Sequence, residues 1–244
     1  MSRAVLGLQP VREAIRAHGE RVEKVLVERS DSPQLEALAR FARDRGVAVE
    51  RVGRGDLDRL SKGGRHQGAI AFAPELAVVS DVASLELGPS ALVVVLDELE
   101  DPQNFGAVVR SAVAFGANAV VWPEHHAAPL TAATFRASAG AIEHASLCRV
   151  AGIPTALAEL RARGVFVVGL DPQGEADIGA IDLARPVALV VGAEGKGLRR
   201  SVKQACDALA RLPIAKTVAS LNASVAAAVA LYETSRQRAA VSSG

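Results

Sequence analysis

Four apolar runs in the second half of the chain constrain its fold more than any other feature. Such continuous runs are typical of strands that lie inside a parallel sheet with both faces covered. Helical patterns separate the runs, and this alternation predicts an open α/β sheet. The runs are ALVVVLDEL at 91–99, NAVVW at 118–122, VFVVGL at 165–170 and PVALVVG at 186–192, with helical patterns at 103–115, 130–139 and 154–163.

The front of the chain predicts a second, smaller α/β module. Short strand and helix patterns alternate there, and the stretch that follows has no single period, which favours a linker. We therefore divide the chain into a front module at 1–75, a linker at 76–90 and a larger domain at 91–244. Strand patterns in the front module lie at 22–28, 47–52 and 68–73, and helical patterns at 9–18, 33–46 and 56–60.

The uneven distribution of charge is compatible with nucleic-acid binding by the front module. Residues 1–75 carry 14 Lys and Arg against 11 Asp and Glu, although the net charge of the whole chain is only +1. This local excess permits contact with phosphates, and it is equally compatible with an ordinary solvated surface.

The sequence contains no feature of a secreted, metal-binding or membrane protein. Its two cysteines, Cys148 and Cys206, have no paired metal-ligand spacing, so we expect no metal site. We find neither a cleavable leader nor a run of 18 apolar residues. These absences predict a cytoplasmic protein without membrane contact.

A first polar motif, DPQN, follows the first apolar run and opens a helix. Asn104 lies near the start of this helix, where its amide can cap the helix or reach into a site. Arg110 follows six residues later and can bind a phosphate or another oxygen. The spacing alone is equally compatible with a helix cap and a surface ion pair.

A second motif, GAEGKGL, follows the fourth apolar run. Gly192, Gly195 and Gly197 permit a backbone path that other residues avoid, and Glu194 lies inside the turn. The glycine order G-x-x-G-x-G differs from the dinucleotide fingerprint, and the triphosphate-binding loop would need a glycine where Val190 stands. The glycine order therefore argues against a nicotinamide-dependent dehydrogenase.

A third motif, ASLNAS, precedes a helix rich in alanine. Ser220 or Asn222 can cap this helix. The small side chains at 223–230 let another backbone pack closely. The helix can therefore be a tightly packed terminal element or half of a dimer interface, with or without a catalytic role for the polar loop before it.

The three motifs in this order resemble those of the SpoU (TrmH-type) RNA ribose 2′-O-methyltransferases. The resemblance is carried by DPQNFGAVVRSAVAFGA, VVGAEGKGL and ASLNASVAAAVALYE, and it covers about residues 90–240. GLQPVREAI at 7–15 and GGRHQGAIAFAPE at 63–75 resemble the substrate-binding domain that precedes this catalytic domain. The chain is most similar to the bacterial 23S rRNA guanosine-2′-O-methyltransferase branch.

The resemblance implies a SPOUT fold, in which the C-terminal part of a parallel α/β sheet threads through a loop as a deep trefoil knot. Such a knot is a rare exception among protein folds. The front module is expected to have a ribosomal-protein-like RNA-binding fold. The resemblance also implies a homodimer whose active site is completed across the interface, S-adenosylmethionine as cofactor without a metal, and 23S rRNA or a large-subunit assembly intermediate as substrate. A guanosine of the peptidyl-transferase loop is the expected target.

Functional residues carry over by motif position. The implied catalytic residues are Asn104 and Arg110 from the first motif, Glu194 from the second, and Ser220 and Asn222 from the third. The implied cofactor-binding residues are Gly169, Leu170, Gly192, Leu212, Ile214 and Leu221. The candidates for RNA contact are Arg54, Lys62, Arg65, His66 and Gln67, which are also compatible with an exposed polar loop.

The chemistry assigns the central role to Arg110. A ribose hydroxyl is a poor nucleophile near neutral pH, so its deprotonation must be assisted. An arginine normally stays protonated, and Arg110 is therefore expected to orient the 2′-hydroxyl and to stabilise developing negative charge. We expect Asn104, Glu194 and Asn222 to hold Arg110 and the RNA in place, and Ser220 to support the loop.

Two other functions remain open at this point. The first is a tRNA ribose methyltransferase of the same superfamily, against which the front module argues. The second is an RNA-binding ribosome-assembly factor without catalysis, against which the intact set of five polar motif residues argues.

Overall fold

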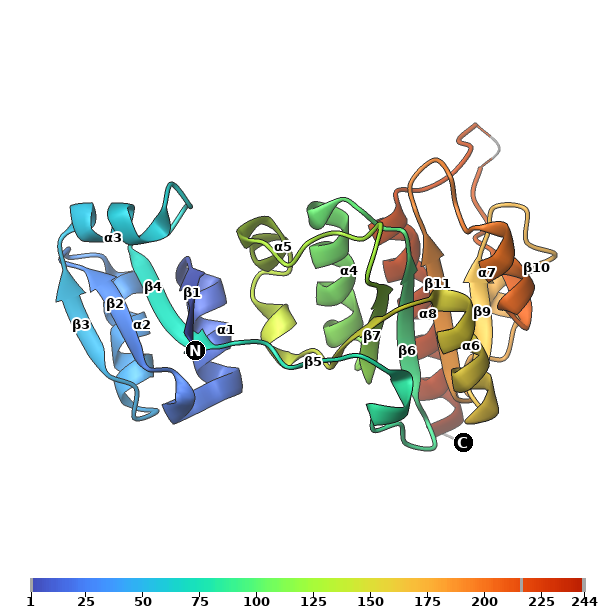
Figure 1. The fold of residues 1–244 in the computed structure, drawn as a ribbon, viewed down its shortest axis with the longest axis horizontal. Helices are drawn as coiled ribbons and strands as arrows, with labels where there is room; N and C mark the ends of the chain where they lie inside the picture. The colour runs from blue at the N-terminus through green and yellow to red at the C-terminus, as the bar shows by residue number, and fades with distance from the viewer. Residues whose placement is uncertain (1, 216, 243–244) are drawn as a thin grey trace. The chain divides into compact units, whose positions relative to one another are not determined.

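The computed structural model describes residues 2–215 and 217–242, which form two compact units (Figure 1). Unit 1 contains the residues up to Leu76 together with Leu130–His144. Unit 2 contains the rest of the chain. No helix within the described ranges is long and apolar enough to cross a bilayer.

Unit 1 is built on a mixed sheet of four strands in the order β1-β4-β2-β3. β4 is antiparallel to both of its neighbours, and β2 is parallel to β3. The three predicted strands are confirmed, whereas the pattern missed the first one. The strands are β1 (Ser2–Leu6), β2 (Lys24–Glu28), β3 (Val49–Val52) and β4 (Ala69–Pro74).

Helices cover both faces of this sheet, because its strands are apolar on both sides. Val25 and Val27 belong to one buried cluster with the apolar residues of α1 and α2. Leu26, between them in sequence, belongs to a second cluster with Leu57 of α3. The helices are α1 (Leu8–His18), followed by the 3₁₀ turn η1 (Gly19–Arg21), α2 (Pro33–Arg43) and α3 (Arg54–Ser61).

A later segment of the chain, Leu130–His144, packs with unit 1, which the sequence did not predict. It forms α5 (Ala132–Ala137) and the 3₁₀ turn η3 (Ala141–His144). Gly140 approaches α1 so closely that an added Cβ would lie 2.8 Å from Glu13 Cβ and Pro10 Cα, which only glycine avoids.

Two glutamates fasten this segment to the front of the chain. The fully buried carboxylate of Glu143 accepts hydrogen bonds from Arg3 and, at 2.9 Å, from His18 Nε2. On α1, Glu13 Oε2 lies 3.0 Å from His144 Nε2. Contacts between residues more than 120 positions apart leave no periodic signal, so the pattern assigned this helix only to the larger domain.

Unit 2 is built on a sheet of eight strands in the order β10-β12-β9-β11-β6-β7-β8-β5, with every pair parallel. The four predicted apolar strands are confirmed as β6, β7, β9 and β11. The strands are β5 (Val78–Val79), β6 (Leu92–Asp97), β7 (Ala119–Pro123), β8 (Leu147–Val150), β9 (Phe166–Leu170), β10 (Ala176–Asp177), β11 (Val187–Gly192) and β12 (Ala208–Arg211).

Helices also cover both faces of the larger sheet. α6 and α7 bury their apolar residues with Val93, Val95 and the strand residues that share that face. α4 and α8 pack against each other, and α8 also contacts β11 (Figure 1). The helices are α4 (Pro102–Ala114), α6 (Ile153–Ala162), α7 (Arg200–Ala205) and α8 (Ala223–Ser242), with 3₁₀ turns η2 (Val82–Ser84) and η4 (Ile178–Ala180).

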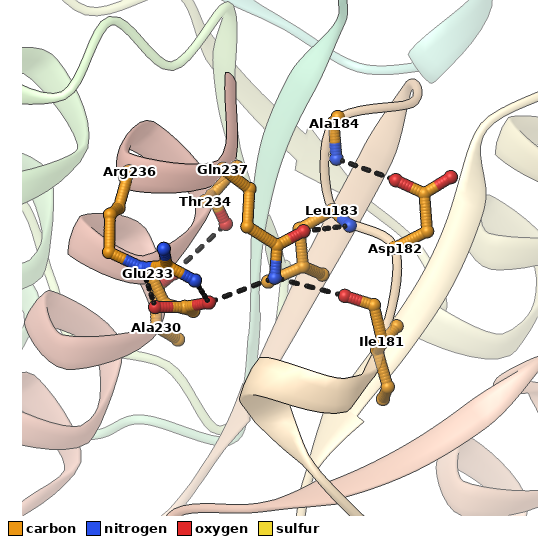
Figure 2. A network of polar contacts seen from close by, with 9 residues as sticks. All are labelled: Ile181, Asp182, Leu183, Ala184, Ala230, Glu233, Thr234, Arg236 and Gln237. Carbon is orange, nitrogen blue, oxygen red and sulfur yellow. Dashed lines mark hydrogen bonds and ion pairs between the residues drawn. The ribbon is translucent and has the colours of Figure 1, made fainter. Parts of the chain in front are cut away.

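A polar network fastens the second half of α8 to the segment after η4 (Figure 2). Gln237 Oε1 accepts a hydrogen bond from the Leu183 N–H at 2.8 Å, and Gln237 Nε2 donates to the Ile181 carbonyl at 3.1 Å. Glu233 accepts from Gln237 Nε2 and from Arg236. α8 is therefore held in register by side chains as well as by packing.

The order of strands reverses next to β6. From β6 the chain proceeds to β7 and β8 on one side of β6. The next long strand, β9, lies on the other side of β6, and β11 lies between β9 and β6. The carboxyl ends of β6 and β11 are neighbours, with Asp97 opposite Gly192. Open parallel sheets bind ligands at such a reversal. The trefoil knot implied by the resemblance stays a prediction.

Candidate active site

The first motif begins α4 with a well-formed cap. Asp101 precedes the helix, and its carboxylate accepts hydrogen bonds from the N–H groups of Gln103 at 3.1 Å and Asn104 at 3.2 Å. Pro102 occupies the first turn, where a missing N–H costs nothing. Because Asp101 caps the helix, the amide of Asn104 is left for another partner.

That partner is Asn222 of the third motif, which joins all three motifs. Asn222 Nδ2 donates to Asn104 Oδ1 at 3.0 Å and also to Glu194 Oε1 of the second motif. Asn104 is buried, whereas Glu194 and Asn222 are exposed. The structure thus brings three of the five predicted catalytic residues into direct contact.

Asn222 also holds the start of α8. Its Oδ1 accepts hydrogen bonds from the backbone N–H of Ser224 at 2.9 Å and of Val225 at 3.3 Å. Asn222 therefore caps α8, and of the two predicted cap residues, Ser220 and Asn222, the second is confirmed. One side chain fixes the helix start with its oxygen and the other two motifs with its nitrogen.

The glycine-rich turn of the second motif requires its glycines. A Cβ on Gly192 would lie 2.3–2.5 Å from backbone atoms of Gly197 and Leu198, so no other residue fits there. Gly195 and Gly197 have φ angles of +74° and +65°, in the left-handed region that favours glycine. The Gly197 N–H closes the turn by donating to the Ala193 carbonyl at 2.9 Å.

An ion pair between a buried acid and an exposed arginine, which sequence reasoning missed, anchors this turn to β6. Asp97 is fully buried, and its carboxylate accepts from the Arg199 N–H at 2.9 Å and from Arg199 Nε at 2.8 Å. The bond to Asp97 is the main reason why the pKa of Arg199 lies above its usual value. The sequence signal that could have indicated this pair is Asp97, an acidic residue at the end of an otherwise apolar strand.

A second pair, also missed, anchors the end of β9 to α7. Asp171 is buried, pairs with Lys203 and accepts from the Gln173 N–H at 2.8 Å. Burial alone would raise the pKa of Asp171, but the bonds from Lys203 and Gln173 outweigh it and hold that pKa below its usual value. The segment 199–203 is thus tied to the carboxyl ends of two strands.

Arg110 lies apart from the three joined residues. Six positions separate it from Asn104, which turns it about 120° away around the helix axis. Its side chain is exposed and makes no hydrogen bond or ion pair with any residue in the described ranges. Ser220, also exposed, likewise makes no hydrogen bond within those ranges. Their catalytic roles stay predictions.

Three of the six residues predicted to bind the cofactor lie at the carboxyl ends of strands. Leu170 and Gly192 end β9 and β11, and Leu212 directly follows β12. Gly169 is a packing position, because an added Cβ would meet Leu198 and Leu209 at 2.8 Å. Ile214 and Leu221 lie in the loop between β12 and α8, and the backbone N–H groups of Leu212, Ile214 and Leu221 have no acceptor in the described part of the chain.

Four of the five predicted RNA-contact residues are exposed on unit 1. Arg54 starts α3 and Lys62 ends it with a φ of +48°. Arg65 and Gln67 lie in the turn before β4, and Gln67 Oε1 accepts from the Leu8 N–H at 3.3 Å.

His66 differs from its neighbours because it is only 6% exposed. Its Nδ1 accepts from the Gly68 N–H at 3.0 Å, and its Nε2 lies 2.9 Å from Asp58 Oδ1. Both ring nitrogens are therefore engaged in shaping the turn. Contact of His66 with RNA stays a prediction.

Comparison with known proteins agrees with this site. Residues 91–232 match the SpoU rRNA Methylase family, and residues 4–78 match the family described as RNA 2′-O ribose methyltransferase substrate binding. The chain belongs to the SpoU rRNA methylase family. All three motifs of the joined site lie inside the first match.

Two relatives match this SpoU protein over nearly its full length. The TrmH family protein YacO of Bacillus subtilis (strain 168) is 39% identical over 238 residues, which cover 96% of this chain and 95% of YacO. The SpoU methyltransferase AviRb from Streptomyces viridochromogenes, solved in complex with AdoMet, is 27% identical with a TM-score of 0.79, covering 98% of this chain and 91% of AviRb. The parallel α/β fold of SpoU methyltransferases is thereby confirmed, whereas the knot stays a prediction.

A tRNA-modifying member of the family matches less of the SpoU protein. The TrmH/SpoU tRNA modifying enzyme of A. aeolicus is 26% identical with a TM-score of 0.57, and the match covers 65% of this chain and 80% of that enzyme. The rRNA methyltransferase from Sinorhizobium meliloti, solved with AdoMet bound, is 27% identical with a TM-score of 0.76, and the match covers 96% of this chain and 87% of that enzyme.

Proposed function

We propose that this SpoU RNA methyltransferase transfers a methyl group from S-adenosylmethionine to the 2′-hydroxyl of a guanosine in 23S rRNA, in the peptidyl-transferase loop, during ribosome maturation in the cytoplasm. The observation that carries the proposal is the bridge from Asn222 to Asn104 and Glu194 at the reversal point of the sheet. Residues 1–75 would bind the RNA, and residues 91–244 would perform the reaction.

The carboxyl edge of the sheet fits S-adenosylmethionine. The free N–H groups of Leu212, Ile214 and Leu221 are suitable donors for an adenine ring, and the tight turn at Gly192 lets the backbone approach a ligand closely. When bound, S-adenosylmethionine supplies an electrophilic methyl group. The residues that would hold it are Gly169, Leu170, Gly192, Leu212, Ile214 and Leu221.

Arg110 would bind the reacting ribose. Its guanidinium has no partner within the described ranges, so it is free to meet the 2′-hydroxyl and to stabilise the negative charge that develops on the oxygen. Asn104, Glu194 and Asn222 form a rigid polar surface that would orient the sugar. Ser220 would support the loop.

The protein would act as a homodimer through the face formed by α4 and α8. Three large apolar side chains on α8 are exposed there, with Val225 at 47%, Val229 at 41% and Tyr232 at 58%. They line a shallow groove with Ala107 and Ser111 of α4, which flank Arg110 in sequence. Exposed apolar surface of this kind favours association. A partner on this face would therefore lie next to Arg110.

The choice of rRNA over tRNA rests on unit 1. The rRNA methyltransferase from Sinorhizobium meliloti matches 96% of this chain, whereas the match to the A. aeolicus tRNA modifying enzyme is confined to about two thirds of it. The test is methyl transfer from labelled S-adenosylmethionine to unmodified 23S rRNA and to an unmodified tRNA pool, followed by mapping of the methylated ribose. Transfer to 23S rRNA alone supports the proposal. Transfer to tRNA alone contradicts it, and absence of S-adenosylmethionine binding by calorimetry would favour a non-catalytic assembly factor.

A further inference from the structure

Phe41 on α2 is surrounded by more positive charge than any other aromatic residue in the described chain. The protein has only six Phe, one Tyr and one Trp. Three of the Phe rings have one cation over them, from Arg3, Lys24 and Arg185 respectively. Phe41 has three, with the guanidinium carbons of Arg45, Arg12 and Arg16 at 3.7, 4.8 and 5.8 Å from the ring centroid. We call these four residues the Phe41 cluster.

The guanidinium groups of the Phe41 cluster are only partly neutralised. Arg16 pairs with Glu13 at 2.8 Å. Arg12 and Arg45 are exposed, and neither makes an ion pair with a residue of the described ranges. Glu20 and Asp44, the other acids close to these arginines in sequence, form no ion pair with any of the three. Three like charges around one ring repel one another, so the cluster favours an anionic ligand.

The cluster lies on the face of the sheet opposite α3, the helix at whose ends two of the predicted RNA-contact residues lie. α1 and α2 share a buried apolar cluster on one side of the sheet, and α3 packs on the other side. Arg54 and Lys62 flank α3, whereas the four residues of the Phe41 cluster come from α1, from α2 and from the turn after α2. The cluster is therefore a second positive surface on the same unit.

We propose that the Phe41 cluster binds the phosphodiester backbone of the RNA substrate, an inference that rests on the proposed function. Arginine is suited to this role because its planar guanidinium donates two parallel hydrogen bonds to a phosphate. The ring of Phe41 holds Arg12 and Arg45 in place before RNA arrives, which lowers the entropy that binding must overcome. Unit 1 then contacts RNA on two faces.

The test compares RNA binding by the full chain and by Arg12→Ala/Arg45→Ala. Fluorescence anisotropy with an unmodified transcript of the 23S rRNA domain that contains the peptidyl-transferase loop gives Kd over a series of KCl concentrations. We expect a Kd about tenfold higher for the double variant at low salt. The slope of log K against log[salt] should become shallower by about 1.4, because each lost phosphate contact removes about 0.7.

The matched control is Lys24→Ala/Arg185→Ala, which removes the same charge by deleting two cations that each lie over a single Phe ring. Lys24 pairs with Glu50 and lies over Phe72, which belongs to the α3 face. This control should bind as the wild type does. Phe41→Leu should give an intermediate Kd, because it keeps the bulk of the ring and loses its attraction for the guanidinium groups.

The proposal is overturned if Arg12→Ala/Arg45→Ala binds with the Kd and salt slope of the wild type, or if the control loses as much affinity. Methyl transfer by the wild type to the same transcript separates this failure from failure of the proposed function. A wild type that methylates the transcript while the double variant binds it normally refutes the Phe41 cluster alone. A wild type that neither binds nor methylates the transcript refutes both.

Discussion

The joined site of unit 2 consists of Asn104, Glu194 and Asn222, and the cationic loop of unit 1 is the exposed segment that contains Lys62 and Arg65. These two regions are built in opposite ways. In unit 2, Asn104, Glu194 and Asn222 hold one another by side-chain hydrogen bonds. In unit 1, Lys62 and Arg65 are exposed and make no ion pair within the described ranges. A reacting atom must be held within tenths of an ångström, whereas a polyanion is attracted over a long distance and tolerates mobile cations.

This contrast predicts different responses to mutation. A change in the joined site should affect turnover or helix capping with little dependence on salt. A change in the cationic loop should affect RNA affinity and its salt dependence. Three experiments test the contrast, from the largest expected effect to the smallest, and a fourth, with the smallest effect, tests the polar network of α8 outside both regions.

Replacing Arg110, which makes no ion pair within the described ranges, should have the largest effect on methyl transfer. We expect Arg110→Ala to lower the rate of methyl transfer by about 10²- to 10³-fold, which is typical for loss of a group that stabilises developing charge. Binding of S-adenosylmethionine by calorimetry and the molar mass by light scattering should stay as in the wild type. Near-normal transfer by this variant would remove Arg110 from the mechanism.

Asn222 allows capping and bridging to be separated. Asn222→Ala removes both and should lower the free energy of unfolding by about 1 kcal/mol. Asn222→Ser keeps a capping oxygen and should retain most of the stability, but it loses the donor to Asn104 and Glu194. We expect about tenfold slower transfer in both variants, measured beside urea unfolding. Full activity of Asn222→Ser would mean that the bridge is dispensable.

The cationic loop should respond through affinity. For Lys62→Ala/Arg65→Ala we expect a several-fold higher Kd for RNA at low salt and a salt slope shallower by about 1.4. The difference from the wild type should shrink at high salt, because exposed charges are then screened. Anisotropy titrations at two salt concentrations measure it, and an effect that is independent of salt would contradict the contrast.

The smallest effect concerns the far end of α8. Hydrogen bonds from Arg236 and Gln237 lower the pKa of Glu233 to about 2. A depressed folded-state pKa stabilises the protein above the unfolded value, and this contribution is lost as the pH falls from about 4.5 towards 2. Glu233→Gln should therefore lower Tm by about 2 °C at pH 6 and by less at pH 3. Equal shifts at both pH values in thermal melts would refute this assignment.

Periodicity predicted the parts of the fold that have long apolar runs. β6, β7, β9 and β11 were predicted because each is buried on both faces. β8 and β12 were missed because an arginine interrupts the short apolar run of each, and β5 and β10 were missed because they have only two residues. The pairing of Leu130–His144 with unit 1 depends on contacts across more than 120 positions, which no local pattern encodes.

The motifs predicted which residues belong to the site, but they did not predict which partners these residues bind. The resemblance identified Asn104, Glu194 and Asn222, but the cap on α4 is Asp101, and Asn104 is free to bind Asn222. The pair of Asp97 and Arg199 spans 102 positions and matches no spacing rule. An ion pair of this kind can be found only when the strand order is known.

The path of the chain through unit 1 limits how these enzymes can exchange specificity. The chain enters or leaves unit 1 at three points, after Leu76, after Pro129 and after His144. Grafting only the first 76 residues of a homologue onto this protein would leave Glu143 facing foreign side chains in place of Arg3 and His18. A working chimera must therefore inherit the later segment as well, so new RNA targets are expected to arise by point substitution within unit 1 more readily than by recombination at a single junction.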